Sequence, residues 1–306
     1  MCALTTSGGV DCWGGDNTFG ELGDGNDQPS NVPVPVSGIS NAIALANAGA
    51  PGNPTAGDAC ALLATGTVEC WGRHAGTNSD GTIASSYVPE PVTGMSSATA
   101  LTAGGYYTCA AISSGSVSCK DIETNPATYT SFPIQATSVV ASTTEAYYAC
   151  AVLSSGGVDC WGQNYTGQLG DGTTTSSSSP VQASGVTGAK ALAIGLAYTV
   201  ASWGNHTCAV LTSGGVDCWG YNGYGELGNG TSGPGHDSSV PVSVSGLSGA
   251  VAVTATYSEF STGGGTTCAL LTDGAVDCWG ANNYGQLGDG ATGSSSSTPV
   301  RVTGLG

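Results

Sequence analysis

The cysteines of this 306-residue chain constrain its fold more than any other feature. Twelve cysteines form six pairs, and nine residues separate the two members of every pair. The phrases that contain them span residues 2–13, 60–71, 109–120, 150–161, 208–219 and 268–279. A fixed phrase that recurs at long intervals is typical of a repeat architecture, in which each repeat is one supersecondary unit. We therefore expect one repeat array, folded as a single domain over residues 1–306.

Each cysteine pair frames a predicted β-hairpin. In CALTTSGGVDCWG, which starts at Cys2, the apolar residues Leu4 and Val10 flank a Ser-Gly-Gly turn. Pairing Leu4 with Val10 places Cys2 opposite Cys12, and directly opposed Cβ atoms lie about 4.5–5.5 Å apart, within reach of a disulfide. The same register predicts six disulfides: Cys2–Cys12, Cys60–Cys70, Cys109–Cys119, Cys150–Cys160, Cys208–Cys218 and Cys268–Cys278.

Reduced thiols and a bound metal are the two alternatives to disulfides. Structural zinc sites use ligands two to four residues apart, and the spacing here is longer. Two cysteines are predicted opposite each other in each of the six hairpins, and six such arrangements argue against reduced thiols. Because disulfides persist in oxidising compartments, we expect the protein to be extracellular or displayed on a cell surface.

The charge balance excludes several classes of partner. Four Lys and Arg residues stand against 21 Asp and Glu, for a formal net charge of −17. Affinity for nucleic acid rests on cationic side chains that neutralise phosphates, so nucleic acids and anionic membrane surfaces are poor partners. No apolar run approaches the length of a membrane span. No signal peptide is visible either, so we expect a mature or excised segment whose targeting sequence lies outside this chain.

Two further elements recur between the hairpins. A proline-led strand starts at Pro33, Pro91, Pro133, Pro180, Pro241 and Pro299. A strand of small residues starts at Ala42, Ala98, Ala189 and Ala250, with a weaker version at Ala136. Each full unit thus has four short strands in the order small-residue, CAL, CWG and proline-led. Four-stranded units repeated about an axis predict an all-β fold, a β-propeller of about six blades.

The first unit differs from the others, because no small-residue strand precedes Cys2. We expect a vacancy for one strand beside residues 2–5, and a ring whose seam joins residues 1–14 and 299–306. A vacant strand edge is a site for strand addition, so assembly with other molecules is one expected function.

The loop that follows the CWG strand carries a resemblance to a known family. The string CWGANNYGQLGDG from Cys278, with similar strings from Cys12, Cys160 and Cys218, resembles the repeat of the regulator of chromosome condensation (RCC1-type) family. NHTCAVL from Asn205 is similar to the start of that family's second strand. The resemblance implies a propeller, with seven blades in the founding member. The third repeat departs from the pattern, since VSCKDIETNP from Val117 lacks both WG and GQLG, and the paired cysteines indicate a secreted, disulfide-rich relative.

Signals for catalysis or metal binding are weak. The chain has three histidines and no Gly-x-Ser-x-Gly, and His206 occupies a position of the repeat motif, which favours a structural hydrogen bond. The loops after the CWG phrases carry Asp24, Asp171, Glu226 and Asp289 but lack the alternating ligands of a calcium loop, and turn chemistry accounts for them. We expect no enzyme, no metal and no cofactor, with calcium as the minor alternative. The five tryptophans of the CWG phrase are expected in the core: Trp13, Trp71, Trp161, Trp219 and Trp279.

The loops before each CAL strand and after each CWG strand are expected at one end of the blade, opposite the Ser-Gly-Gly turns. Long loops on a rigid scaffold concentrate recognition, and exposed Tyr and Trp are preferred anchors. The candidate binding residues are Tyr106, Tyr107, Tyr147, Tyr148, Tyr198, Trp203, His206, Tyr257 and Phe260. They predict an extracellular, non-enzymatic protein-binding or assembly module. A glycan-binding propeller and a secreted hydrolase are the alternative functions. The alternative without a function is that these aromatic side chains only pack loop against loop.

Overall fold

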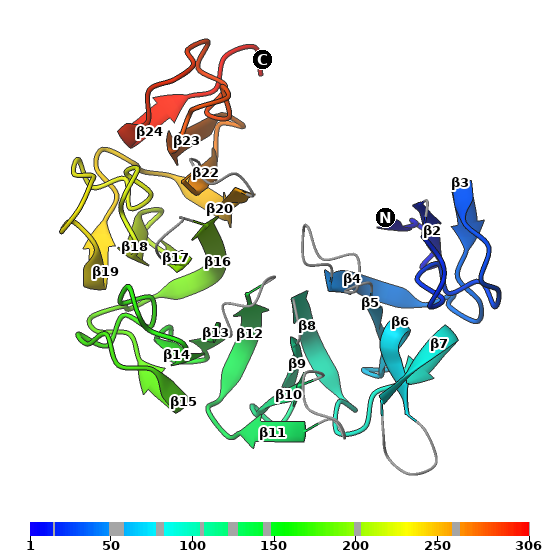
Figure 1. The fold of residues 1–306 in the computed structure, drawn as a ribbon. Coiled ribbons are helices and arrows are strands. Elements are labelled where there is room, and N and C mark those ends of the chain that lie inside the picture. The colour runs from blue at the N-terminus through cyan, green and yellow to red at the C-terminus, as the bar shows by residue number, and fades with distance from the viewer. Residues whose placement is uncertain are drawn as a thin grey trace. The chain divides into compact units, whose positions relative to one another are not determined.

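The computed structural model describes residues 1–14, 16–48, 58–77, 83–104, 107–121, 128–142, 148–198, 203–258 and 264–305. Within these ranges the regular structure is 24 β-strands and no helix, so none contains a helix that could cross a membrane. The strands form six sheets (Figure 1), each of which is one blade. The all-β fold class and the six blades are confirmed.

The strand bounds follow the cysteine phrases and the small-residue strands of the sequence. The first three sheets contain β1 (Cys2–Leu4), β2 (Val10–Gly14) and β3 (Ser30–Pro35); β4 (Ala42–Ala48), β5 (Asp58–Leu63), β6 (Val68–Thr77) and β7 (Ile83–Pro91); β8 (Ala98–Gly104), β9 (Tyr107–Ile112), β10 (Val117–Asp121) and β11 (Thr128–Phe132). The other three contain β12 (Ala136–Ala141), β13 (Tyr148–Leu153), β14 (Val158–Gly162) and β15 (Ser177–Gln182); β16 (Ala189–Tyr198), β17 (Trp203–Leu211), β18 (Val216–Gly220), β19 (Ser238–Ser243) and β21 (Tyr257–Ser258); β20 (Ala250–Ala255), β22 (Thr266–Leu271), β23 (Val276–Gly280) and β24 (Ser296–Arg301).

The order of strands within the sheets is the predicted one. Five sheets contain a small-residue strand, a CAL strand, a CWG strand and a fourth strand in this order, as in β4-β5-β6-β7. The fourth strands differ from the predicted proline-led ones, because each begins at least three residues before its proline, and β7 and β11 end at Pro91 and Phe132. The first sheet has the order β1-β2-β3, so in the described part of the chain it lacks the small-residue strand, as predicted. The fifth sheet gains an unpredicted member, because β21 pairs in parallel with β16.

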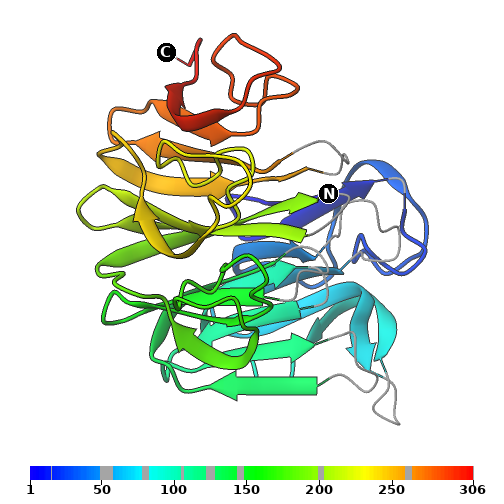
Figure 2. The ribbon, with the colours of Figure 1, turned by 60° about the vertical axis from the view of Figure 1, so that its left-hand side comes forward.

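The chain divides into two compact units, Met1–Tyr147 and Tyr148–Gly306. Each is described by itself, and the single domain, the ring and its seam stay predictions. Within the second unit, Figure 2 shows the orange and red sheet of β20–β24 next to the yellow-green sheet of β16–β19, consistent with the packing of β20 against β16 and β17.

The disulfide register is confirmed in all six hairpins. Cys2 lies opposite Cys12, Cys60 opposite Cys70, and the other four pairs are opposed in the same way. All six S–S bonds are formed, across Cα–Cα distances of 4.0–4.1 Å. Such short distances are typical of the pairs in an antiparallel ladder that exchange no backbone hydrogen bonds.

Successive blades dock through the tight turns. The N–H of Ala42, at the start of β4, donates to the carbonyl of Gly8 in the preceding turn at 2.8 Å, and the N–H of Ala250 donates to Gly214 O at 2.9 Å. Gly214 has a φ of +83°, and a Cβ there would lie 2.8 Å from the amide N of Gly249. Glycine therefore meets two requirements in this turn, the left-handed backbone and the close approach of the next blade.

The tryptophans of the CWG strands also join neighbouring blades. Trp219 and Trp279 are fully buried, and each indole N–H donates at 2.8 Å to a backbone carbonyl of the preceding blade's loop, Gln168 O and Glu226 O respectively. Trp71 and Trp161 are buried as well, which confirms the core prediction for four of the five. Trp13 is only half-buried, so the core prediction does not hold for this tryptophan.

Lys120 stands at the tryptophan position of the third repeat. The side chain is buried, with 4% of its surface exposed. Burial lowers the pKa of Lys120, and the negative charge of Asp58 in the preceding blade opposes that shift. An attraction between charges thus takes the place of the indole in this blade.

Candidate functional site

Loops of similar design follow β2, β14, β18 and β23, and each closes around one buried asparagine. In the loop after β18, Asn222 Oδ1 accepts the Leu227 N–H at 3.0 Å, and Nδ2 donates to Thr231 O at 3.0 Å and His236 O at 3.3 Å. Asn17, Asn164 and Asn282 hold the other three loops with the same bond from a leucine N–H. The side chain satisfies backbone groups that the loop leaves unpaired, so it fixes the loop's path.

The acidic residues of these loops serve turn chemistry. Asp171 Oδ1 accepts the Thr173 N–H at 3.0 Å, and Asp289 Oδ1 accepts the Ala291 N–H at 2.9 Å. Both are side-chain bonds to the backbone two residues on, the pattern of an Asx turn. Among the described residues, no group of three or more His, Cys, Asp or Glu is arranged to hold a metal ion.

Three of the candidate aromatic residues come together at the loop end of the fifth sheet. β16 and β17 extend into the loop region, and Tyr198 lies directly opposite Trp203 at their ends. The short strand β21 lies on the other side of β16, with Tyr257 opposite Leu196, two residues before Tyr198. The sequence predicted these residues on loops; they lie instead on three adjacent hydrogen-bonded strands.

The other candidates fall into three groups. Tyr106, Tyr147 and Phe260 lie outside the described residues. Tyr107 is half-buried at the first position of β9, opposite Gly104 and Asp121. The remaining two, Tyr148 and His206, are buried.

Tyr148 and His206 tie neighbouring blades together. The Tyr148 hydroxyl donates to His206 O at 3.0 Å, and burial raises the pKa of Tyr148. The His206 Nε2 lies 2.8 Å from the Thr267 hydroxyl of the last blade, and burial lowers the pKa of His206 to about 4. Their burial corrects the expectation of direct contact with a partner for these two residues, and it agrees with the structural role expected of His206.

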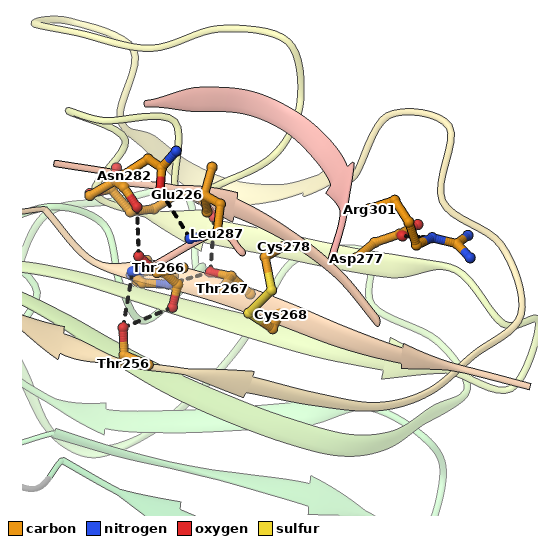
Figure 3. The surroundings of a disulfide bond; sticks show 12 residues. Glu226, Thr256, Thr266, Thr267, Cys268, Asp277, Cys278, Asn282, Leu287 and Arg301 are labelled. Carbon is orange, nitrogen blue, oxygen red and sulfur yellow. Dashed lines mark hydrogen bonds and ion pairs between the residues drawn. A yellow bond between two sulfur atoms is a disulfide. The ribbon is translucent and has the colours of Figure 1, made fainter. Parts of the chain in front are cut away.

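Glu226, which the sequence placed among the acidic loop residues, is a buried carboxyl group whose burial was not predicted. Its side chain is fully buried, with Oε2 accepting the Tyr224 N–H at 2.8 Å and Oε1 accepting the Gly265 N–H at 3.1 Å. Figure 3 shows Glu226 in the surroundings of the Cys268–Cys278 disulfide. The backbone carbonyl of Glu226 also accepts a hydrogen bond from the Thr267 hydroxyl. Burial raises the pKa of Glu226 to about 8, against the effect of the two N–H donors. The equivalent residues of two other loops, Gln168 and Gln286, are uncharged amides, which indicates that this position suits a neutral side chain.

Two loop tyrosines reach solvent at the same end of the blades. Tyr165 is 66% exposed and Tyr284 is 64% exposed. Tyr165 directly follows the buried Asn164, and Tyr284 lies two residues after the buried Asn282. In the first loop, Phe19 is covered instead, because the Arg73 guanidinium lies 4.4 Å from its ring centroid. Exposed aromatic side chains held by an ordered loop are suited to contact a partner surface.

Comparison with known proteins identifies the repeat. The sequence pattern of the regulator of chromosome condensation (RCC1) repeat matches residues 155–210, 213–270 and 273–306, and a second RCC1 repeat pattern matches residues 258–286. Residues 155–306 carry RCC1-type repeats. The RCC1 recognition that the loop strings predicted is therefore confirmed, and the structure adds six disulfides to the repeats.

The RCC1-type chain is also similar to two curated relatives. It is 32% identical over 133 residues to the ultraviolet-B receptor UVR8 of Arabidopsis thaliana, which covers 43% of this chain and 27% of the receptor. It is 30% identical over 132 residues to the E3 ubiquitin-protein ligase HERC2 of Homo sapiens, which covers 43% of this chain and 3% of the ligase. The match thus spans less than a third of either relative.

Solved structures show the same fold. Prp20p from Saccharomyces cerevisiae gives a TM-score of 0.69 at 17% identity, over 98% of the RCC1-type chain and 74% of Prp20p. Human WBSCR16 gives a TM-score of 0.70 at 18% identity, over 96% of this chain and 79% of the other. At these identities the likeness establishes the RCC1-type β-propeller fold class.

Proposed function

We propose that this RCC1-type chain is a non-enzymatic protein-binding module that acts outside the cell. The observation that carries the proposal is the aromatic group Tyr198, Trp203 and Tyr257 on three paired strands of one sheet. Backbone pairing holds these residues, so little conformational freedom is lost when they contact a partner. Aromatic residues of this kind dominate the binding energy of many protein interfaces.

The comparisons support protein binding as the class of function. The Prp20p structure is described together with its binding to Gsp1p and histones, and yeast RCC1 (Prp20) has been solved bound to Kap60. Those partners belong to the yeast protein. For the present chain they support a protein partner over a small molecule, and the net charge of −17 favours a partner with a basic surface.

The extracellular setting rests on the disulfides. Six bridges in one chain are typical of proteins that fold in an oxidising compartment. The test is the intact mass of protein recovered from its native source, before and after reduction. We expect the mass to rise by about two daltons per bridge on reduction. An unchanged mass would remove the basis for an extracellular role.

The binding site is tested by alanine substitution after a partner has been captured with the full chain. Trp203→Ala and Tyr257→Ala should each weaken binding by about 2 kcal/mol, measured by titration calorimetry. Ser7→Ala and Ser213→Ala, in the tight turns at the other end of the blades, are the matched controls and should bind normally. Equal losses from both sets contradict the site. Capture of a glycan, or turnover of a hydrolase substrate, would replace the proposal with one of its rivals.

A further inference from the structure

Three segments of the chain have the acceptor pattern for N-linked glycans, which is Asn, any residue except Pro, and then Ser or Thr. They are residues 164–166, 205–207 and 229–231, and each ends in Thr. A glycan is bulky and hydrophilic, so a folded protein accepts one only where the amide nitrogen of the asparagine can reach solvent and is not needed by the fold. The structure separates the three asparagines on these two criteria.

The first two asparagines are buried parts of the fold. Asn164 is 0% exposed, and its Nδ2 donates to Thr173 O and Thr175 O, each at 3.1 Å. A glycan would replace one of the two N–H groups that make these bonds. Asn205 is 1% exposed in β17, and Thr207 of the same acceptor pattern is fully buried. At either asparagine a glycan would have to pass through close-packed protein, so the folded chain excludes it.

The third asparagine, Asn229, lies at the surface in the loop after β18. Its own side chain is half-buried, and the next two residues, Gly230 and Thr231, are exposed. Asn229 Oδ1 accepts the Thr231 N–H at 3.1 Å and the Thr231 hydroxyl at 2.8 Å, which makes an Asx turn. Within the part of the chain that the structure describes, Asn229 Nδ2 donates no hydrogen bond. The turn therefore uses the oxygen of this amide and leaves its nitrogen free.

The equivalent residues of the other three loops show that the fold does not need this nitrogen. They are aspartates, and each makes the same turn through one carboxylate oxygen: Asp24 Oδ1 accepts the Asn26 N–H, Asp171 Oδ1 the Thr173 N–H and Asp289 Oδ1 the Ala291 N–H. The amide nitrogen is the one group in which Asn229 differs from these residues. A substituent on Nδ2 thus removes no hydrogen bond from the loop.

We propose that Asn229 carries an N-linked glycan and that Asn164 and Asn205 carry none. The proposal rests on the extracellular setting proposed above, because N-linked glycans are a modification of secreted chains. The donor is a lipid-linked oligosaccharide. A bond forms between Asn229 Nδ2 and the anomeric carbon of the first sugar, and the bond from that carbon to the pyrophosphate of the lipid breaks. The pyrophosphate leaves with the electron pair, and one amide proton passes to a base of the transferase.

The neighbouring blade fixes where the glycan stands. The N–H of Gly230, which follows Asn229 directly, donates to Ser297 O in β24 at 2.8 Å. In the described part of the chain, β24 is the last strand in the order of its sheet. The glycan therefore projects from the loop beside the outer strand of the neighbouring sheet.

The test uses the chain recovered from its native source and an amidase that releases N-linked glycans. The amidase hydrolyses the bond between Cγ and Nδ2 of the asparagine and leaves an aspartate. In water enriched in heavy oxygen, this aspartate takes up the label, which separates it from aspartate formed earlier by deamidation. Peptide mass spectrometry should find the label at position 229 and unmodified asparagine at positions 164 and 205. An unlabelled position 229, or a label at either of the other two, overturns the proposal.

Two variants of one residue provide a matched control. Thr231→Ala destroys the acceptor pattern but keeps Asn229, and the purified chain should lose the mass of one glycan. Thr231→Ser preserves the pattern and should keep that mass. Equal masses of the Thr231→Ala chain and the parent chain, apart from the substitution itself, contradict the proposal.

The disulfide content of the same samples separates this proposal from the proposed function. Formed bridges with an unmodified Asn229 overturn the glycan and leave the extracellular setting in place. Reduced cysteines together with an unmodified Asn229 overturn both.

Discussion

At the scale of single residues, Glu226 is expected to set how the stability of the second unit varies with pH. Its folded pKa of about 8 exceeds the ordinary value of 4.5, so the folded state holds the proton more tightly than the unfolded state. This stabilisation is complete below pH 4.5 and is lost as the pH rises toward 8. In that window the contribution of Glu226 to the free energy of unfolding should fall by up to about 1.4 kcal/mol per pH unit.

Glu226→Gln should flatten this alkaline decline, as measured by urea unfolding between pH 5 and 8. At pH 8 the variant should be the more stable protein, because no charge is buried. The matched control is Glu21→Gln, which changes the same atom at the equivalent position of the first loop, where the side chain is half-buried. A decline that survives in Glu226→Gln would show that another group causes it.

His206 should cause a loss of stability at acid pH, opposite in direction to the effect of Glu226. Its folded pKa of about 4 lies below the ordinary value of 6.5, so stability is present above pH 6.5 and is lost as the pH falls toward 4. Between about pH 4.5 and 6.5 the contributions of His206 and Glu226 change in opposite directions and offset each other, so the net alkaline decline should appear above about pH 6.5. His206→Gln should remove the acid limb, and His236→Gln, on an exposed loop, should retain it.

At the scale of elements, the loop after β18 is expected to depend on Asn222 for its shape. Asn222→Ala removes the acceptor of the Leu227 N–H and the donor to two carbonyls, all at a fully buried position. We expect a loss of about 2–4 kcal/mol and faster hydrogen exchange at the Leu227 amide. Asn229→Ala, in the same loop but half-buried, should cost less than about 1 kcal/mol. Equal losses would mean that the loop is held by other contacts.

The elements also show how far the sequence predicts the structure. Strand order, the missing first strand and all six cysteine registers follow from local pattern, because a hairpin's register depends on its own turn and alternation. Contacts between blades were harder to foresee. The sequence places Tyr148 and His206 at the ends of loops or the starts of strands. Their burial depends on contacts with the neighbouring blade. The burial of Glu226 was not predicted for the same reason, since its side chain accepts a hydrogen bond from Gly265 of the next blade.

At the scale of the whole molecule, the disulfides are expected to contribute through chain entropy and packing together. All six close loops of the same length, so the entropic part should be about 2–3 kcal/mol for each. Replacing Cys208 and Cys218 by Ala should cost more than replacing Cys2 and Cys12, because Cys208 is buried and Cys2 is half-buried. Unfolding in guanidinium chloride measures the difference, and equal costs would assign the whole effect to chain entropy.

The single domain is also testable at this scale. One domain of six repeats should melt in one calorimetric transition whose calorimetric and van't Hoff enthalpies agree. Two resolved transitions would instead indicate that residues 1–147 and 148–306 unfold independently.

Every disulfide closes a loop within one hairpin, and none joins one blade to the next. Under a force that pulls on the two ends, non-covalent contacts alone resist the separation of blades, while each cross-linked hairpin stays shortened. Ten peptide units lie between the bridged residues, whose Cα atoms stay 4.0 Å apart, so every bridge withholds about 30 Å of extension. Such a chain lengthens in steps under load, and at full extension it still contains six loops closed by disulfides. When the force is removed, each disulfide still holds the CAL and CWG strands of its hairpin in register for refolding.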